Sequence, residues 1–150
     1  MTKNQKLKLS VKTVEDMNVM STLCQDAVGM KRNMRWHQKD KMFSMTFNRF
    51  MWEDFQQGIE DRNHQYRIQS IMIFRWILSV KRRGFQVGSN SEYFSLLSIS
   101  YKQNKGANRV SLIFSGDSEI CLEVEYLEAF LNDIGDSYPA VIEKLPRHEI

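Results

Sequence analysis

Apolar residues near the start of the chain recur at intervals of three and four, which is the period of an amphipathic helix. A short strand-like segment at 7–11 comes first, and Thr13 then precedes Asp16 by three residues, so its hydroxyl can cap the first free N–H groups of a helix. The apolar positions are Val14, Met17, Met20, Leu23, Cys24, Ala27 and Val28. Gly29 can supply a left-handed stop. The pattern therefore predicts one helix that begins at Val14 and continues to Gly29.

From residue 30 onward the period becomes two, which indicates strands with one buried face and one face in water. Runs at 33–37 and 43–48 flank a polar turn and predict a hairpin. The run 66–83 is long enough for two strands, or for one strand that bends near Arg75. Further alternating runs, which predict more hairpin arms, lie at 97–101, 110–114 and 120–124. We expect a long loop at 56–65.

The helical period returns near the C-terminus, where the apolar residues lie at i, i+3, i+4 and i+7: Leu127, Phe130, Leu131 and Ile134. Acidic residues at 125 and 128 suit the positive end of a helix dipole, and Gly135 can end the helix. The pattern predicts a C-terminal helix at about 124–134 that packs on the sheet.

These elements together predict an α+β fold. We expect an antiparallel sheet or partly open barrel of about six to seven strands, with an N-terminal helix and a C-terminal capping helix, an order compatible with a pleckstrin-homology-like barrel. With 150 residues, of which 42% are hydrophobic, the chain can bury a sizeable core without metals or disulfides. One globular domain is expected over 1–138, with 139–150 as a mobile tail.

Cysteine use and hydropathy predict a cytoplasmic protein without a membrane span. The two cysteines, Cys24 and Cys121, are too few for a disulfide framework and lack metal-ligand spacing. The longest apolar stretch, 71–80, is interrupted by Arg75 and is too short to cross a bilayer. We expect no metal and no cofactor.

Charge is distributed unevenly along the chain. Residues 1–83 hold sixteen Lys or Arg against eight Asp or Glu, whereas residues 84–150 hold five against ten. The first part is therefore +8 and the second −5, within a total of +3. A basic surface in the first part would suit nucleic acid, but the two parts can also interleave in space and cancel.

The segment 48–53 joins an arginine, a carboxylate and two aromatic rings at the end of a strand. Arg49, Trp52 and Glu53 are candidates for binding an anion or a planar ligand. The favoured interpretation is a structural corner, with Trp52 in the core and Arg49 paired to Glu53 or Asp54.

A second basic cluster consists of Lys81, Arg82 and Arg83, with Arg75 upstream. These four residues are candidates for contacting phosphate groups, although a solvated strand end is the favoured interpretation.

An enzyme is the least favoured class. His37 lies on the polar face of its strand and His64 lies in the polar loop, and neither belongs to a motif that pairs a base with a nucleophile. The chain contains no GxGxxG, phosphate-binding loop, GxSxG or HExxH pattern.

Several blocks together resemble a family of short alphaproteobacterial proteins of unknown function. They are Cys24-Gln25-Asp26-Ala27-Val28, Phe47-Asn48-Arg49-Phe50-Met51-Trp52-Glu53, Val80-Lys81-Arg82-Arg83-Gly84, Ile113-Phe114-Ser115-Gly116, Leu122-Glu123-Val124-Glu125 and Leu131-Asn132-Asp133-Ile134-Gly135. The resemblance runs in order from about Leu7 to Gly135, and it implies no activity. Where members often have a cysteine after the final strand, this chain has Tyr126, which argues against thiol chemistry there.

We therefore expect a non-catalytic binding or scaffold module that recognises an unidentified protein or a small anionic ligand. A nucleic-acid-binding protein is the alternative, and an enzyme of unrecognised type is the third.

Overall fold

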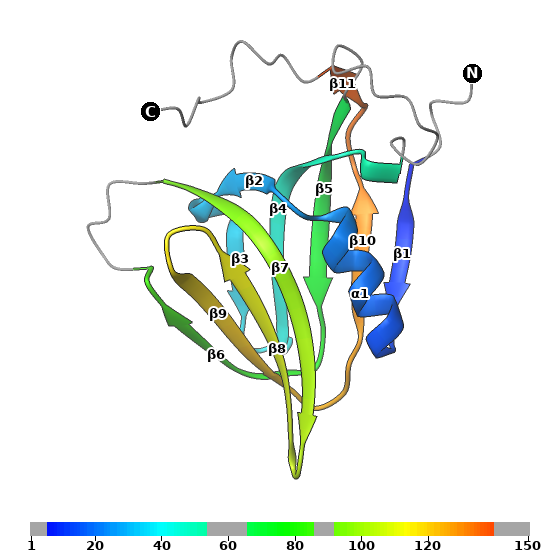
Figure 1. Ribbon diagram of the computed structural model, residues 1–150. Coiled ribbons are helices and arrows are strands. Elements are labelled where there is room, and N and C mark those ends of the chain that lie inside the picture. The colour runs from blue at the N-terminus through cyan, green and yellow to red at the C-terminus, as the bar shows by residue number, and fades with distance from the viewer. Residues whose placement is uncertain (1–5, 54–65, 86–91, 140–150) are drawn as a thin grey trace.

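The computed structural model describes residues 6–53, 66–85 and 92–139, and these residues form one antiparallel sheet with one α-helix (Figure 1). The helix is α1 (Val14–Leu23), and η1 (Lys31–Asn33) is a short 3-10 turn. The eleven strands are β1 (Lys8–Val11), β2 (Ala27–Met30), β3 (Met34–His37), β4 (Met42–Phe50), β5 (Tyr66–Phe74), β6 (Ile77–Arg83), β7 (Tyr93–Asn104), β8 (Ala107–Phe114), β9 (Ser118–Val124), β10 (Ala129–Asp133) and β11 (Tyr138–Pro139).

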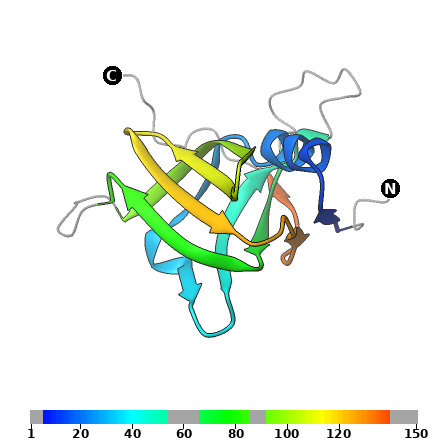
Figure 2. The same ribbon diagram turned by 90° about the horizontal axis from the view of Figure 1, so that it is seen from below.

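The sheet curls around its core without closing. Its strand order is β1-β10-β5-β4-β2-β7-β8-β9-β6, with β3 also paired to β4 and β11 to β5. Within the described residues, β1 and β6 stand at the two ends of this path and do not pair with each other. Figure 2 shows the strands curving around a common centre. The helix α1 contacts both β7 and β1, so it covers the space between two strands that are far apart in the strand order.

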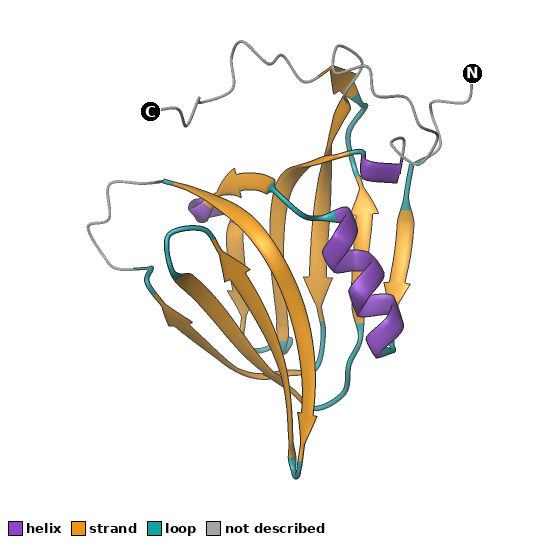
Figure 3. Cartoon of the chain, in the orientation of Figure 1, coloured by secondary structure: helices purple, strands orange, loops and turns teal. Residues whose placement is uncertain are grey.

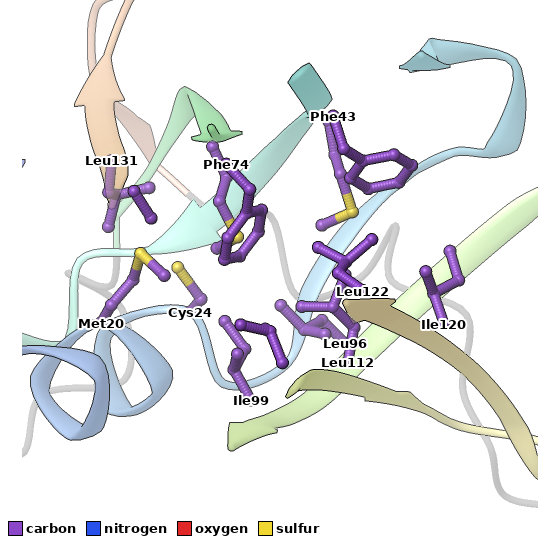
Figure 4. Packing of buried hydrophobic residues seen from close by; sticks show 14 of the residues in the cluster. Met20, Cys24, Phe43, Phe74, Leu96, Ile99, Leu112, Ile120, Leu122 and Leu131 are labelled. Carbon is purple, nitrogen blue, oxygen red and sulfur yellow. The ribbon is translucent and has the colours of Figure 1, made fainter. Parts of the chain in front are cut away.

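The core lies inside the curl, where each strand points alternate side chains. In β4 the alternation is strict, and Phe43, Met45 and Phe47 are all buried. Side chains from α1 and from distant strands meet there, as Figure 4 shows for Met20, Cys24, Leu131 and Ile99. Burial of each such apolar side chain contributes roughly 1.5–3 kcal/mol. The core therefore depends mainly on contacts between residues far apart in sequence.

The predicted start of the first helix is confirmed, but its predicted end is wrong. Thr13 and Asp16 form the reciprocal capping box. The helix stops at Leu23, and Ala27–Met30 forms β2, which pairs with β7 and β4. Gly29 serves close packing, because a Cβ at this position would lie 2.7 Å from the carbonyl oxygen of Thr46.

The run 66–83 forms two strands, β5 and β6, which separate at Arg75 and Trp76. Trp76 has φ of +60°, an unusual backbone conformation for a bulky residue. The turn sends β6 to the far end of the strand order, beside β9. The predicted hairpin of 33–37 with 43–48 is confirmed as β3 and β4.

The predicted C-terminal helix is wrong. Residues 129–133 form β10, which pairs with β1 on one side and β5 on the other (Figure 3). Ala129, Leu131 and Asp133 point inward, and Ile134, a residue of the predicted helix face, is 47% exposed. Pairing with two neighbouring strands outweighs the helical tendency of this short segment, because local propensity is a weak determinant of structure.

The predicted fold class is therefore wrong as well. The described chain is mostly β, with eleven strands in place of six to seven. It has no C-terminal capping helix within the described residues, so the pleckstrin-homology-like arrangement does not apply.

Two other predictions concern segments that lie wholly or mostly outside the described residues. The predicted loop at 56–65 lies outside the described residues, and so does the predicted tail from residue 140 onward. Pro139, by contrast, belongs to β11 and pairs with Tyr66. No helix in the described part of the chain is long and apolar enough to cross a membrane.

Candidate functional site

Arg49 is a completely buried arginine near the end of β4. It follows the inward parity of Phe47, so the strand alternation carries its guanidinium into the interior. The neighbouring strand β5 places Ser70 beside Phe47, and β10 in turn places Asp133 beside Ser70. Three adjacent strands, visible side by side in Figure 1, thus bring these polar residues together.

Every N–H donor of Arg49 has an acceptor. Its Nε and Nη2 donate to Oδ1 and Oδ2 of Asp133, each at 3.1 Å. Its Nη1 and Nη2 also donate to the two carboxylate oxygens of Glu53 at 2.9 Å, and Nη1 donates to the carbonyl oxygen of Phe50 at 3.1 Å. A guanidinium has five N–H groups, so this side chain has no donor left for a ligand.

Asp133 is equally well satisfied. Besides the two bonds from Arg49, its Oδ1 accepts from the Ser70 hydroxyl at 2.6 Å and its Oδ2 accepts from the backbone N–H of Leu7 at 2.9 Å. The backbone N–H of Asp133 donates back to the Leu7 carbonyl oxygen at 2.9 Å. This carboxylate therefore fastens the chain just before β1 to β4, β5 and β10.

The protonation of nearby groups reflects this arrangement. Burial alone lowers the pKa of Arg49, but hydrogen bonds and charge attraction from Glu53 and Asp133 outweigh that effect and raise the pKa above its ordinary value. Burial raises the pKa of Cys24 to about 12; the charge of Arg49 opposes the rise, and those of Asp133 and Glu53 add to it. At neutral pH the guanidinium is thus charged and the thiol neutral, and a neutral buried thiol is a poor nucleophile.

An outer layer of side chains lies on the face of β4 and β5 opposite the one that carries Arg49. Phe50 and Trp52 contact each other edge to face, with ring centroids 5.4 Å apart. The indole Nε1 of Trp52 donates to the carbonyl oxygen of Gln25 at 2.9 Å. Trp52 is only half-buried, so it lies at the boundary of the fold and not in the main core.

Arg67 belongs to this outer layer and differs sharply from Arg49. Its register partners are Phe50 on β4 and Tyr138 on β11. Its guanidinium stacks 3.7 Å from the centroid of the Phe50 ring, and its Nη1 donates to the Asn48 carbonyl oxygen at 3.2 Å. Only 9% of the residue is exposed, yet its Nε has no hydrogen-bond partner.

No described carboxylate forms an ion pair with Arg67. Burial lowers the pKa of this guanidinium, and electrostatic interactions with Tyr138 and Asp26 oppose the lowering only in part. A buried charge is normally paired. Arg67 is therefore a covered cation that forms no direct ion pair with a carboxylate in the described part of the chain.

The sequence-derived candidates do not converge on one patch. Arg49, Trp52 and Glu53 gather at one end of β4. Arg75 directly follows the other end of β5. It lies seven residues beyond Ile68, the register partner of Arg49, and seven residues span roughly 23 Å along a strand. The remaining candidates, Lys81, Arg82 and Arg83, are exposed on β6 at the end of the strand order.

Sequence reasoning anticipated the pairing of Arg49 with Glu53 but missed Asp133, Ser70 and Arg67. Asp133 was assigned to a helix, although it shares the two-residue period of Ala129 and Leu131. That alternation is the signal that could have placed it on the buried face of a strand. No local pattern distinguishes Arg67 from the other basic residues of the chain.

The comparisons with known proteins identify a family without an assigned activity. The family model of DUF2948, described as a protein of unknown function, matches residues 7–148. The chain belongs to the DUF2948 family. The resemblance found in the sequence is thereby confirmed at the level of the family, although its alphaproteobacterial origin stays a prediction. No curated protein and no solved structure matches this DUF2948 chain.

Proposed function

We propose that this DUF2948 protein is a non-catalytic binding module for a small ligand with an anionic group, and that Arg67 holds that group. One observation carries the proposal. Arg67 is only 9% exposed, and its guanidinium stacks on Phe50, leaves Nε without a hydrogen-bond partner and forms no ion pair with a described carboxylate.

The energetics favour an external counter-charge. Removing a guanidinium from water without a paired anion costs free energy, and the cost is recovered only when a charge and its hydrogen bonds are supplied. A carboxylate or phosphate group can supply both, because charge-assisted hydrogen bonds are stronger than neutral ones. Arg67 would thus stabilise a bound anion more than a solvated surface arginine could.

The neighbouring rings suit such a ligand. Phe50 supports one face of the guanidinium, which leaves the in-plane N–H groups that do not bond the Asn48 carbonyl oxygen as donors. Trp52 contacts Phe50, and Tyr138, which is 42% exposed, is the register partner of Arg67 on β11. These aromatic side chains can contact an apolar or planar part of a ligand next to its anionic group.

The experiment compares thermal unfolding in sodium chloride with unfolding in sodium pyrophosphate or sodium citrate at equal ionic strength. A ligand that binds only the folded state raises the midpoint of unfolding. At a ligand concentration ten times the Kd, the free energy of unfolding rises by about 1.4 kcal/mol. We expect both anions to raise the midpoint of the wild type and to have no effect on Arg67→Met.

Arg109→Met is the matched control, because Arg109 is an exposed strand arginine on β8. This variant should respond as the wild type does. A wild type that responds to neither anion would contradict the proposal, and so would an undiminished response in Arg67→Met. Nucleic-acid binding stays a prediction from the uneven charge and is tested in the next experiment.

A further inference from the structure

The strand β6 has an open edge. It is the last strand in the sheet order, and within the described residues it pairs only with β9. In an antiparallel pair, alternate residues turn their N–H and C=O groups away from the partner strand. An edge of this kind can pair with an extended segment of another chain.

The edge strand carries concentrated positive charge. Lys81 and Arg82 are exposed and form no ion pair with any described residue. Arg83 donates to Glu119 at 2.8 Å, but 73% of its side chain stays exposed. The other carboxylate facing β6 from β9, that of Glu123, accepts a hydrogen bond from Ser79.

These charges disfavour a second copy of the same chain as the occupant. If two β6 edges paired antiparallel over their full length, Lys81 would lie opposite Ser79 and Arg82 opposite Leu78, so the positive charges of both copies would gather on one ladder without an acidic partner. Carboxylates in the added strand would instead complement Lys81 and Arg82.

Basic residues also protect an edge from aggregation, but this strand has exposed apolar residues as well. Leu78 is 49% exposed on β6 itself. Trp76, which precedes β6, is 37% exposed, and Tyr126, which follows β9, is 61% exposed. Their rings meet edge to face, with centroids 5.9 Å apart. The Trp76 indole is held by a 2.7 Å hydrogen bond to Glu128.

Exposed aromatic residues that are fixed in position are typical anchors of protein interfaces. A strand that only resisted aggregation would gain nothing from an exposed leucine and two exposed rings at its start. The apolar end and the basic end of β6 together match an extended segment with both apolar and acidic side chains.

We infer that β6 is a docking edge for an extended acidic segment of a partner protein, which adds to the sheet as a further strand beside Ile77–Arg83. The backbone of β6 supplies hydrogen bonds, Lys81 and Arg82 select acidic side chains, and Leu78 contacts an apolar one. This edge is separate from the Arg67 site, so either inference can fail without the other.

Fluorescence polarisation with a labelled peptide that carries two consecutive glutamates next to valines, so that each face of the added strand presents one carboxylate, tests the inference. We expect the wild type to bind it and the double variant Lys81→Glu/Arg82→Glu to bind at least about tenfold more weakly. The matched control is Lys102→Glu/Arg109→Glu, which reverses two exposed charges that face each other on β7 and β8. This control should stay within about twofold of the wild type.

Three further measurements separate strand addition from simple charge attraction. A peptide with alternate backbone amides N-methylated cannot complete the ladder and should lose binding. Leu78→Ser should weaken binding several-fold. A single-stranded oligonucleotide of equal charge should bind more weakly than the peptide.

The inference is overturned if the wild type does not bind the peptide at about 1 mM, or if the control double variant loses as much affinity as the edge variant. Undiminished binding of the N-methylated peptide, or unchanged binding by Leu78→Ser, would also overturn it. Tighter binding of the oligonucleotide would replace it with a nucleic-acid site.

Discussion

Arg49 on β4 and Asp133 on β10 are joined by two hydrogen bonds of 3.1 Å, although 84 residues separate them in the sequence. Strand β5 lies between their strands and contributes Ser70 to the same carboxylate. Both residues of the pair are buried, since Arg49 is fully covered and Asp133 is 5% exposed. It therefore fixes the order of three strands at the end of the sheet where Arg67 lies.

We predict that Asp133→Asn strongly destabilises the fold. The substitution removes a negative charge from a buried guanidinium, and breaking one side of a buried ion pair costs about 3–5 kcal/mol. Chemical denaturation measures the loss. Asp136→Asn is the control, because among the described residues this fully exposed carboxylate forms only a 3.9 Å ion pair with Lys6, and its effect should stay within about 0.5 kcal/mol. Similar losses for the two variants would contradict the structural role of Asp133.

The assignment of 129–133 to a strand predicts unequal effects of two apolar substitutions. Leu131 is fully buried on β10, whereas Ile134 is 47% exposed. Leu131→Ala should cost about 2–5 kcal/mol, and Ile134→Ala should cost well under half as much. The helical interpretation placed both side chains on one buried face. Equal losses of unfolding free energy would favour that helix over β10.

The sequence was informative wherever the structure depends on neighbouring residues. The Thr13–Asp16 cap, the β3–β4 hairpin and the break near Arg75 all depend on short-range patterns. Alternation along the chain also identified most of the strands. What it did not yield was their order, because pairs such as β1 with β10 join residues more than a hundred positions apart.

The two misassigned segments fail for related reasons. Residues 27–30 and 129–133 each have apolar spacing that fits a helix, yet each lies between two strands that pair with it. The site was predicted only in part for the same reason. Glu53 is four residues from Arg49 and was within reach of local reasoning, but Asp133 comes from a strand at the other end of the sequence.

The buried thiol predicts how stability depends on alkaline pH. Burial, the main cause, raises the pKa of Cys24 from 9.0 to about 12. Below the pKa of the thiol in the unfolded state, Cys24 is protonated in both states, and its contribution to the free energy of unfolding is fully present. Between about 9 and 12 only the unfolded state loses the proton, so the contribution falls as pH rises, by roughly 4 kcal/mol in total.

The measurement is the unfolding free energy of wild type and Cys24→Ala from pH 8 to pH 11. Other groups titrate in this range, so the difference between the two proteins isolates the thiol. The wild type should lose stability faster than the variant as pH rises. Parallel curves for the two proteins would show that Cys24 ionises as readily in the folded state as in the unfolded one.

The central claim is that Arg49 stabilises the fold, whereas Arg67 is available to bind a ligand. Chemical denaturation of Arg49→Met and Arg67→Met in sodium chloride, without any multivalent anion, tests it most directly. Arg49→Met should lose about 3–5 kcal/mol, because Asp133 stays buried without its partner. Arg67→Met should stay within about 1 kcal/mol of the wild type or gain stability, because an apolar side chain replaces an unpaired buried charge. A loss in Arg67→Met as large as that in Arg49→Met would contradict the claim and would make both arginines structural.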